Sequence, residues 1–172
     1  MKPEVGDLVD GCISLRLLER DDLPRTLGWR NRDDVRMWFF DSRVIDIETH
    51  TAWFDRYENR DDDFVFIVNA NDRPVGQVAI YNIDRTTAEG EFGRLLIGEP
   101  AVAGRGYAGV AGKLACTFAW TNLGLSRLRC EIKSDNVRSL KACTRAGFVE
   151  TARRPGVIEM IAHRQDPWRD RK

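Results

Sequence analysis

The sequence has 172 residues, with 27 lysines and arginines balanced by 27 aspartates and glutamates, so its formal net charge is zero. This length predicts one domain with a sizeable core, and the neutral balance argues against a nucleic-acid partner, which requires a basic field. Four cysteines without a Cys-x-x-Cys pair and two histidines argue against a metal site, and the lack of an export or membrane-spanning stretch predicts a cytoplasmic protein.

The first half of the chain predicts a strand, two helices and then three more strands. Apolar and polar residues alternate in Ile13–Leu18, which predicts a strand, and Pro24 after two aspartates marks the start of a helix. The second helix is predicted over 46–60, where Phe54 and Tyr57 share an apolar face. Three successive strands are predicted at 63–69, 73–83 and 88–98. The short turns between them require neighbouring strands to be antiparallel.

A glycine-rich segment, Ala101–Lys113, opens the second half and leads into a helix that is predicted to end at Asn122. A strand at 126–134, a helix capped by Asp135 or Asn136, and a last strand at 157–164 follow. This order predicts a single α/β domain over 1–172, with tails at 1–12 and 165–172. We expect a central mixed, mostly antiparallel sheet of six to seven strands with helices on both faces.

Glycines at a helix entrance predict an anion site, because they expose backbone N–H groups that have no partner inside the helix. A mononucleotide-binding loop is excluded, since Leu114 follows the lysine where Ser or Thr is required. Gly104, Gly106 and Gly109 match the dinucleotide pattern Gly-x-Gly-x-x-Gly, with Glu131 at the place of a ribose-binding acid. An NAD-dependent oxidoreductase is therefore an alternative, although an antiparallel meander precedes the loop where that fold needs parallel units.

The coenzyme A pyrophosphate is the third candidate, and here the sequence resembles a known family. Glu91–Leu114 is similar to the acetyl-CoA-binding segment of the GNAT superfamily of N-acetyltransferases, whose loop reads Gln/Arg-x-x-Gly-x-Gly/Ala, with Ala103 in place of the leading Gln/Arg. Asn136–Phe148 resembles the second signature, Asn-x-x-Ser/Ala-x-x-Leu-Tyr-x-x-x-Gly-Phe, with Cys143 in place of its tyrosine. The resemblance extends from Ile13 to His163.

This resemblance implies the GNAT fold and direct transfer of an acetyl group from acetyl-CoA to a primary amine in a ternary complex. It implies that the pyrophosphate binds the loop residues Ala103, Gly104, Arg105, Gly106, Tyr107 and Ala108. The strand end that would receive the thioester oxygen through a backbone N–H comprises Leu95, Leu96 and Ile97. Asn136 and Ser139 would contact the pantetheine arm.

A general base is needed because a protonated amine, with a reference pKa of about 10.4 for lysine, is not a nucleophile near neutrality. The resemblance implies that Glu91 is this base and acts through water. Glu91 could instead be an exposed strand carboxylate or a partner of Arg94, in which case Glu89 on the same strand face is the alternative. Cys143 would protonate the leaving thiolate or, as a small residue, pack against the cofactor.

The acceptor cleft in this family is built by the first helices and their connecting loop. The corresponding candidates here are Trp29, Arg30, Asn31, Arg36, Phe39 and Phe40. Aromatic and guanidinium groups suit a nucleotide or a sugar. The sequence also resembles the branch of the family that acetylates nucleotide-linked amino sugars, a branch that is similar to the ribosomal-protein N-acetyltransferases. Acetylation of a ribosomal-protein N-terminus or an aminoglycoside, and a non-catalytic acyl-CoA-binding module, are the alternatives. The expected partner is a small-molecule amine without nucleic acid or membrane, and a homodimer is left open.

Overall fold

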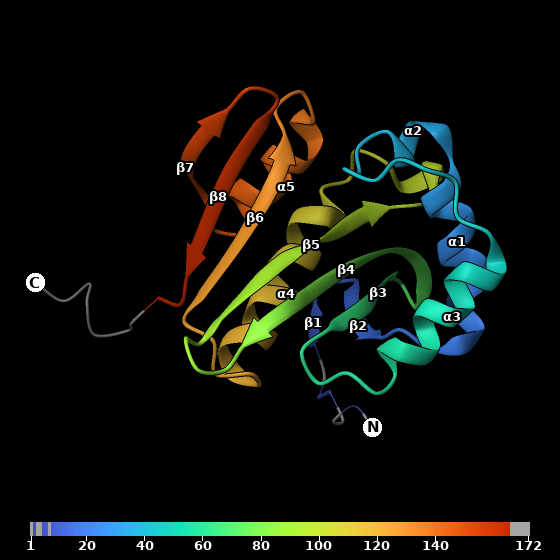
Figure 1. Ribbon diagram of the computed structural model, residues 1–172, viewed down its shortest axis with the longest axis horizontal. Helices are drawn as coiled ribbons and strands as arrows, with labels where there is room; N and C mark the ends of the chain where they lie inside the picture. The colour runs from blue at the N-terminus through green and yellow to red at the C-terminus, as the bar shows by residue number, and fades with distance from the viewer. Residues whose placement is uncertain (1, 3–4, 7, 166–172) are drawn as a thin grey trace, which may run out of the picture.

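Five antiparallel strands from the first hundred residues form one half of the sheet (Figure 1). In the computed structural model, which describes residues 2, 5–6 and 8–165, they are β1 (Leu8–Asp10), β2 (Ile13–Leu17), β3 (Phe64–Ala70), β4 (Arg73–Asp84) and β5 (Glu89–Ile97). Asn71 and Asp72 join β3 to β4 with positive φ angles of 48° and 61°, which a tight two-residue hairpin requires. The expected meander is therefore present.

The other half of the sheet contains β6 (Arg127–Lys133), β7 (Val149–Arg154) and β8 (Val157–His163). Among the described residues the sheet has eight strands, in the order β1-β2-β3-β4-β5-β6-β8-β7. The two halves meet at β5 and β6, which are parallel and pair only from Glu89 with Arg127 to Glu91 with Arg129. Beyond these pairs the two strands diverge (Figure 1), which opens a wedge in the middle of the sheet.

Helices cover both faces of the sheet. They are α1 (Leu23–Asn31), α2 (Asp33–Arg36), α3 (Ile47–Tyr57), α4 (Tyr107–Thr121) and α5 (Val137–Arg145), with short 3-10 turns η1 (Arg20–Asp22) and η2 (Pro100–Val102). Alternate residues of β3 serve the two faces: Phe64 and Phe66 pack against Phe118 of α4, whereas Val65 and Ile67 pack with α3. Burial on both faces explains why the β3 sequence is almost continuously apolar.

The predicted α/β class, with a mixed sheet and helices on both faces, is confirmed. The sheet nevertheless has two more strands than the six that the sequence pattern located. Leu8–Asp10, within the predicted tail 1–12, pairs with β2 as β1, and Val149–Arg154 pairs with β8 as β7. Of the other predicted tail, 166–172 lie outside the described residues. Within the described part of the chain, no helix has the length and apolar content needed to span a bilayer.

Candidate active site

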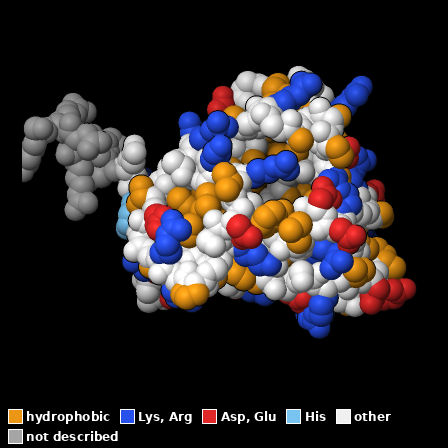
Figure 2. Space-filling model, turned by 90° about the horizontal axis from the view of Figure 1, so that it is seen from above, with side chains coloured by type: hydrophobic (Ala, Val, Ile, Leu, Met, Phe, Trp, Pro, Cys, Tyr) orange, Lys and Arg blue, Asp and Glu red, His pale blue; other side chains and the backbone are white. Residues whose placement is uncertain are grey.

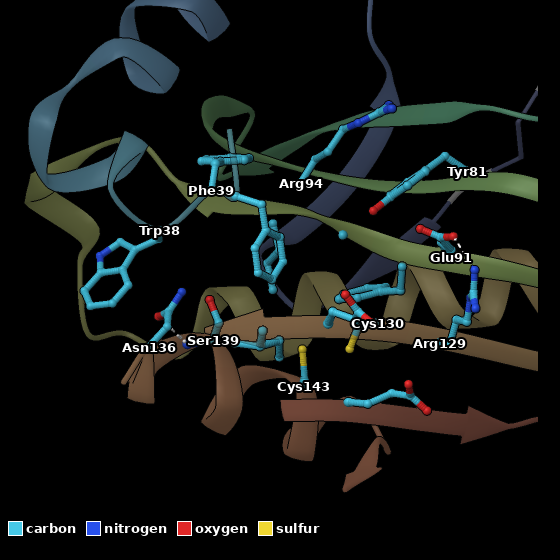
Figure 3. Close-up of a pocket in the computed structure, with 17 residues that line it drawn as sticks. Trp38, Phe39, Tyr81, Glu91, Arg94, Arg129, Cys130, Asn136, Ser139 and Cys143 are labelled. Atoms are coloured by element: carbon cyan, nitrogen blue, oxygen red, sulfur yellow. Dashed lines mark hydrogen bonds and ion pairs between the residues drawn. The ribbon is translucent and has the colours of Figure 1, made fainter. Parts of the chain in front are cut away.

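A cavity of about 340 Å³ lies in the wedge between β5 and β6 (Figure 3). Its walls come from β4, β5, β6 and β8, from α5 and its cap Asn136, and from the segment after α2 that contains Trp38, Phe39 and Phe40. This volume is at the lower end of the range for small-ligand sites. Side chains from distant parts of the sequence therefore line one cavity, which forms where the two parallel strands β5 and β6 diverge.

A β-bulge in β5 borders this cavity. Ala79 of β4 pairs with Gly93 and Gln77 pairs with Leu96, so Arg94 and Leu95 together face one residue of β4. Arg94 has a φ of 49°, the left-handed conformation that non-glycine residues seldom adopt. A bulge of this kind disrupts the hydrogen-bond ladder with the neighbouring strand and leaves the extra residue unpaired.

The three strand-end residues expected to contact the thioester take different positions at this bulge. Leu95 lines the cavity. Leu96 is buried away from it, in a cluster with Trp29 and Val35, and Ile97 pairs with β4 and packs against the main core. Leu95 is therefore the one of the three that the structure places in the candidate site.

Glu91 lies in the last β5–β6 pair before the strands diverge. Its Oε1 accepts a hydrogen bond from Nη2 of Arg129 at 2.8 Å, and this bond is the main reason that the pKa of Arg129 is raised. Tyr81 is its neighbour on β4, and Figure 3 shows the Tyr81 hydroxyl on the same side of the cavity as the Glu91 carboxylate. Burial raises the pKa of Tyr81 to about 12, so this hydroxyl stays protonated near neutrality.

The alternative base, Glu89, lies elsewhere. Its Oε2 accepts a hydrogen bond from Nη2 of Arg127 at 2.7 Å, and among the described residues it is not part of the cavity wall. Arg94, which sequence analysis considered as a partner of Glu91, instead pairs with Asp63. Glu91 is thus the carboxylate of β5 that faces the cavity.

Cys143 of α5 lines the cavity, and Figure 3 shows it beside Cys130 of β6. The neighbouring Cys143 thiol, together with burial, raises the pKa of Cys130 far above its usual range. A third thiol, Cys116 of α4, has its pKa raised to about 12 by burial. At neutral pH, Cys130 and Cys116 are therefore protonated and unreactive.

Asn136 and Ser139 line the cavity at the start of α5. The Asn136 side-chain oxygen accepts a hydrogen bond from the backbone N–H of Ser139 at 3.2 Å, which caps the helix as expected. The cap uses only the oxygen of the amide, so the Asn136 nitrogen can donate to a ligand. These two polar groups and Cys143 lie along one side of α5, where an extended arm could pass.

The glycine-rich loop forms a second part of the candidate site, outside the cavity wall. Gly106 caps α4 in the left-handed conformation, with a φ of 79°, and a side chain there would meet the Arg145 guanidinium at 3.2 Å. Ala103, Gly104 and Arg105 are exposed, and Tyr107 and Ala108 form the first turn of α4. Open backbone at a helix start beside an arginine fits a pyrophosphate group, as the resemblance implied.

Four of the six expected acceptor-binding residues do not line the cavity. Three of them form hydrogen bonds with the segment 37–46, and the fourth, Trp29, is bonded elsewhere. Trp29 is buried, and its Nε1 donates to Glu99 Oε1 at 3.0 Å. Asn31 donates to the Ile45 carbonyl at 2.7 Å and accepts from the Ile45 N–H at 3.0 Å.

The two arginines among these four residues bind backbone carbonyls of the same segment. Arg30 donates to Asp41 and stacks over the Phe39 ring at 4.2 Å, and Arg36 donates to Ser42 at 2.8 Å. The remaining two candidates, Phe39 and Phe40, do line the cavity. The arginines therefore fix the segment that carries Phe39 and Phe40, and Arg30 also contacts the Phe39 ring.

Further cavity residues have no role in the sequence-based proposal. Trp38 extends the aromatic wall, and Glu131 and Glu159 face each other across the β6–β8 pair. The sequence pattern pointed to Glu131 only for the dinucleotide alternative, and Glu159 comes beside it only through the pairing of β6 with β8. Glu131 forms an ion pair with Arg154, and Glu159 accepts a hydrogen bond from Thr151 Oγ1 at 3.3 Å.

Acidic groups outnumber basic ones in the cavity. Among the described residues, the glutamates 91, 131 and 159 line it, together with Arg94 and Arg129. Both arginines are engaged by carboxylates, Arg94 by Asp63 and Arg129 by Glu91. Figure 2 shows charged side chains of both signs interspersed over one face of the molecule.

Comparison with known proteins gives consistent results. The family model described as an acetyltransferase (GNAT) domain matches residues 13–149. The spermidine N(1)-acetyltransferase of Escherichia coli (strain K12) is 25% identical over 136 residues, which cover 79% of this chain and 72% of that protein.

Solved structures with the same fold include two ligand complexes. Spermidine N-acetyltransferase from Vibrio cholerae, in complex with CoA and spermine, superposes with a TM-score of 0.79 at 21% identity, covering 88% of this chain and 95% of that one. AAC(6')-Ib, in complex with parmomycin and acetyl-CoA, superposes with a TM-score of 0.78 at 16% identity, covering 94% and 99%. At these identities, the likeness shows the fold.

Proposed function

Because the chain belongs to the GNAT acetyltransferase family and transfers the acetyl group of acetyl-CoA to amines, we propose that its acceptor is a polyamine. The observation that carries this proposal is the cavity itself, where the glutamates 91, 131 and 159 lie beside an aromatic wall. Carboxylates bind ammonium groups, and aromatic faces attract cations and pack against methylene chains. The spermidine N-acetyltransferases among the relatives support the same acceptor class.

In the proposed reaction, Glu91 accepts a proton from the acceptor ammonium, directly or through a water molecule. Acetyl-CoA supplies an acetyl group that its thioester activates. The backbone N–H of Leu95, in the bulge, donates to the thioester oxygen, and such a donor typically increases the rate by about 100-fold or more. Asn136 and Ser139 bind the pantetheine arm. The neutral acceptor nitrogen bonds to the thioester carbonyl carbon, the carbon–sulfur bond breaks, and the leaving thiolate takes a proton from solvent. We assign Cys143 to packing against the pantetheine arm, with proton donation to the leaving sulfur as the alternative.

The pyrophosphate of acetyl-CoA fits the glycine-rich loop. Gly106 presents its backbone without a side chain, and the first N–H groups of α4 have no carbonyl partner within the helix. The Arg145 side chain lies beside Gly106 and Gly109 and adds a positive charge at this point. The missing Gln/Arg at Ala103 does not remove these contacts, since they come from the backbone and from α5.

A nucleotide-linked sugar, the acceptor favoured by sequence analysis, finds less support. Its diphosphate would need free cationic groups, but Arg30 and Arg36 bind carbonyls of the segment 37–46. The cavity itself is lined by three glutamates and two arginines, and this excess of carboxylates disfavours a diphosphate. An aminoglycoside is the second candidate, because it is also a polycation and AAC(6')-Ib shares the fold.

Acetyl-CoA-dependent thiol release tests the proposal. We expect the highest kcat/KM with spermidine or spermine, and lower values with an aminoglycoside, a nucleotide-linked amino sugar and a short peptide with a free N-terminus. A clear preference for one of the other acceptors would contradict the polyamine assignment while leaving acetyl transfer intact.

Two variants test whether the cavity glutamates bind the ammonium groups of the acceptor. Glu131→Gln and Glu159→Gln should each raise KM for spermidine by roughly tenfold or more, since losing a charge-assisted hydrogen bond costs about 1.5–3 kcal/mol. KM for a monoamine of similar length should change little. Glu150→Gln is the matched control, because Glu150 pairs with Arg153 on β7, outside the cavity. An equal effect on both amines would refute the role in charge recognition.

A further inference from the structure

Arg94, the left-handed residue of the bulge, has a side chain that is anchored outside β5. We propose that its ion pair with Asp63 is a positioning device that holds the bulge open and so fixes the backbone N–H of Leu95. This inference rests on the proposed role of that N–H in acetyl transfer. Neither Arg94 nor Asp63 needs to touch the reacting atoms for this role, so both are positioning residues.

The ion pair has the geometry of a fixed anchor. Nη1 of Arg94 lies 2.8 Å from Oδ1 and 3.1 Å from Oδ2 of Asp63. The Asp63 side chain is only 2% exposed, whereas that of Arg94 is 29% exposed. A carboxylate that is buried this deeply requires its counter-ion, so the pair holds the guanidinium in one place.

Two aromatic rings confine the same guanidinium. Its carbon lies 4.4 Å from the Tyr81 ring centre and 5.7 Å from that of Trp53. Tyr81 can lie across β5 at this point because residue 93 is glycine: a side chain there would meet the Tyr81 hydroxyl at 2.8 Å. Gly93, Tyr81 and Arg94 therefore form one packed arrangement over the bulge.

The backbone of Arg94 is held as well. Nε2 of Gln77 donates to the Arg94 carbonyl oxygen at 3.3 Å, from the strand that faces the bulge. Gln77 thus bridges a gap in the β4–β5 ladder with its side chain. The carbonyl of Arg94 is fixed from β4 and its guanidinium from Asp63, on the segment before β3.

Such an anchor is needed because the bulge is not the relaxed state of the strand. A left-handed non-glycine residue is strained and persists only where its surroundings enforce it. Without the anchor, β5 could pair regularly with β4 by shifting one residue. Successive side chains of a strand point to opposite faces, so that shift would turn Leu95 and its N–H away from the cavity.

The experiment compares two buried ion pairs in the full-length protein. Asp63→Asn and Arg94→Ala disrupt the anchor. Asp22→Asn is the matched control, because Asp22 is also buried and accepts hydrogen bonds from both terminal nitrogens of Arg16 at 2.7 Å, outside the cavity. All three variants should lose thermal stability, since each breaks a pair with a buried carboxylate.

Only the anchor variants should lose catalysis. We expect kcat to fall by about tenfold or more in Asp63→Asn and Arg94→Ala, because a misplaced donor loses much of its effect. Because Arg94 lines the cavity and both variants change its charge or its pairing, the criterion is kcat at saturating amine and not KM. Arg94→Lys, which keeps a positive charge for Asp63, should retain more of kcat than Arg94→Ala.

Two readouts do not depend on activity. In backbone amide NMR spectra of the free protein, Asp63→Asn should shift the signals of residues 93–96, which Asp22→Asn should leave in place. In calorimetric titrations, the ratio of the affinities for acetyl-CoA and CoA should fall in Asp63→Asn, because the two ligands differ only in the acetyl group that the Leu95 N–H would bind.

The possible outcomes separate this inference from the proposed function. Any of three results would overturn the positioning role. The folded anchor variants could keep kcat within twofold of wild type, their amide signals at 93–96 could stay unshifted, or their loss of kcat could equal that of Asp22→Asn. If Asp63→Asn does not fold, Gln77→Ala carries the same expectations through the backbone contact. A wild-type protein without turnover of any amine would instead contradict the proposed function, and the NMR comparison would still decide whether the pair holds the bulge.

Discussion

Replacing Glu91 by glutamine tests the proposed base with little change in shape. The amide oxygen can still accept the hydrogen bond that Arg129 donates to Glu91 at 2.8 Å, so the last β5–β6 pair should remain. Near pH 7.4, an amine with a pKa of about 10.4 is neutral in only about one molecule in a thousand. Since a positioned general base contributes about 10²–10⁴-fold, we expect kcat/KM of Glu91→Gln to fall by about 100-fold or more at this pH.

The pH dependence of the defect gives the decisive measurement. Raising the pH by two units increases the neutral fraction of such an amine by about 100-fold, so the deficit of the variant should shrink as the pH approaches 9.4. Glu89→Gln is the control, because Glu89 lies on the same strand, pairs with Arg127 at 2.7 Å and does not line the cavity. Wild-type kcat/KM in Glu91→Gln across the pH range, or an equal loss in Glu89→Gln, would refute the assignment.

Three further predictions concern cofactor binding, pH and packing. Gly106→Val should abolish the thermal stabilisation by acetyl-CoA, which at one hundred times Kd is worth about 2.7 kcal/mol in the wild type; an unchanged shift would remove the loop from the site. Burial lowers the pKa of His50 below its usual 6.5, so the folded protein should be most stable above pH 6.5 and lose stability as the pH falls below it. The melting temperature of His50→Gln should fall less over the same pH range. Gly98→Ala should destabilise the protein by about 1–3 kcal/mol in urea unfolding, because its Cβ would lie 2.1 Å from the Trp29 ring; unchanged stability would contradict the packing of Trp29 against this backbone.

The fold could be predicted because its strongest signals are local. The apolar run of β3 and the Asn71–Asp72 turn specify a hairpin without reference to any distant residue. The same holds for α5, whose start is marked by Asn136. Each of these segments carries its own pattern, and the short connections between strands determine which of them are neighbours.

Two strands lacked such a pattern. β1 has three residues, too few for an alternation to be recognised. All six residues of β7 are exposed, so its sequence contains no buried positions to mark a strand. Each pairs with the next strand along the chain through a two-residue turn that contains a glycine of positive φ, Gly11 or Gly156.

The candidate site was predictable where it coincides with signature positions. Glu91, Asn136 and Cys143 were named from their positions in the family pattern, and the structure brings them to one cavity. The bulge at Arg94 has no sequence signal, because its conformation depends on Asp63, which is 31 residues away. Arg30 and Arg36, near aromatic residues, suggested a phosphate site. In the structure they instead donate to backbone carbonyls of the segment 37–46, and the sequence alone does not show where that segment lies.

The two outer strands of the sheet also affect how copies of the protein meet. An open sheet edge can template the addition of a strand from another molecule, which leads to aggregation. β1 is too short to present more than a brief edge, and β7 carries the Glu150–Arg153 ion pair and Arg154 on an exposed surface. Short length at one edge and charge at the other are both established protections against edge-to-edge pairing. Any association between copies should therefore use helices, loops or a sheet face rather than a continuous intermolecular sheet.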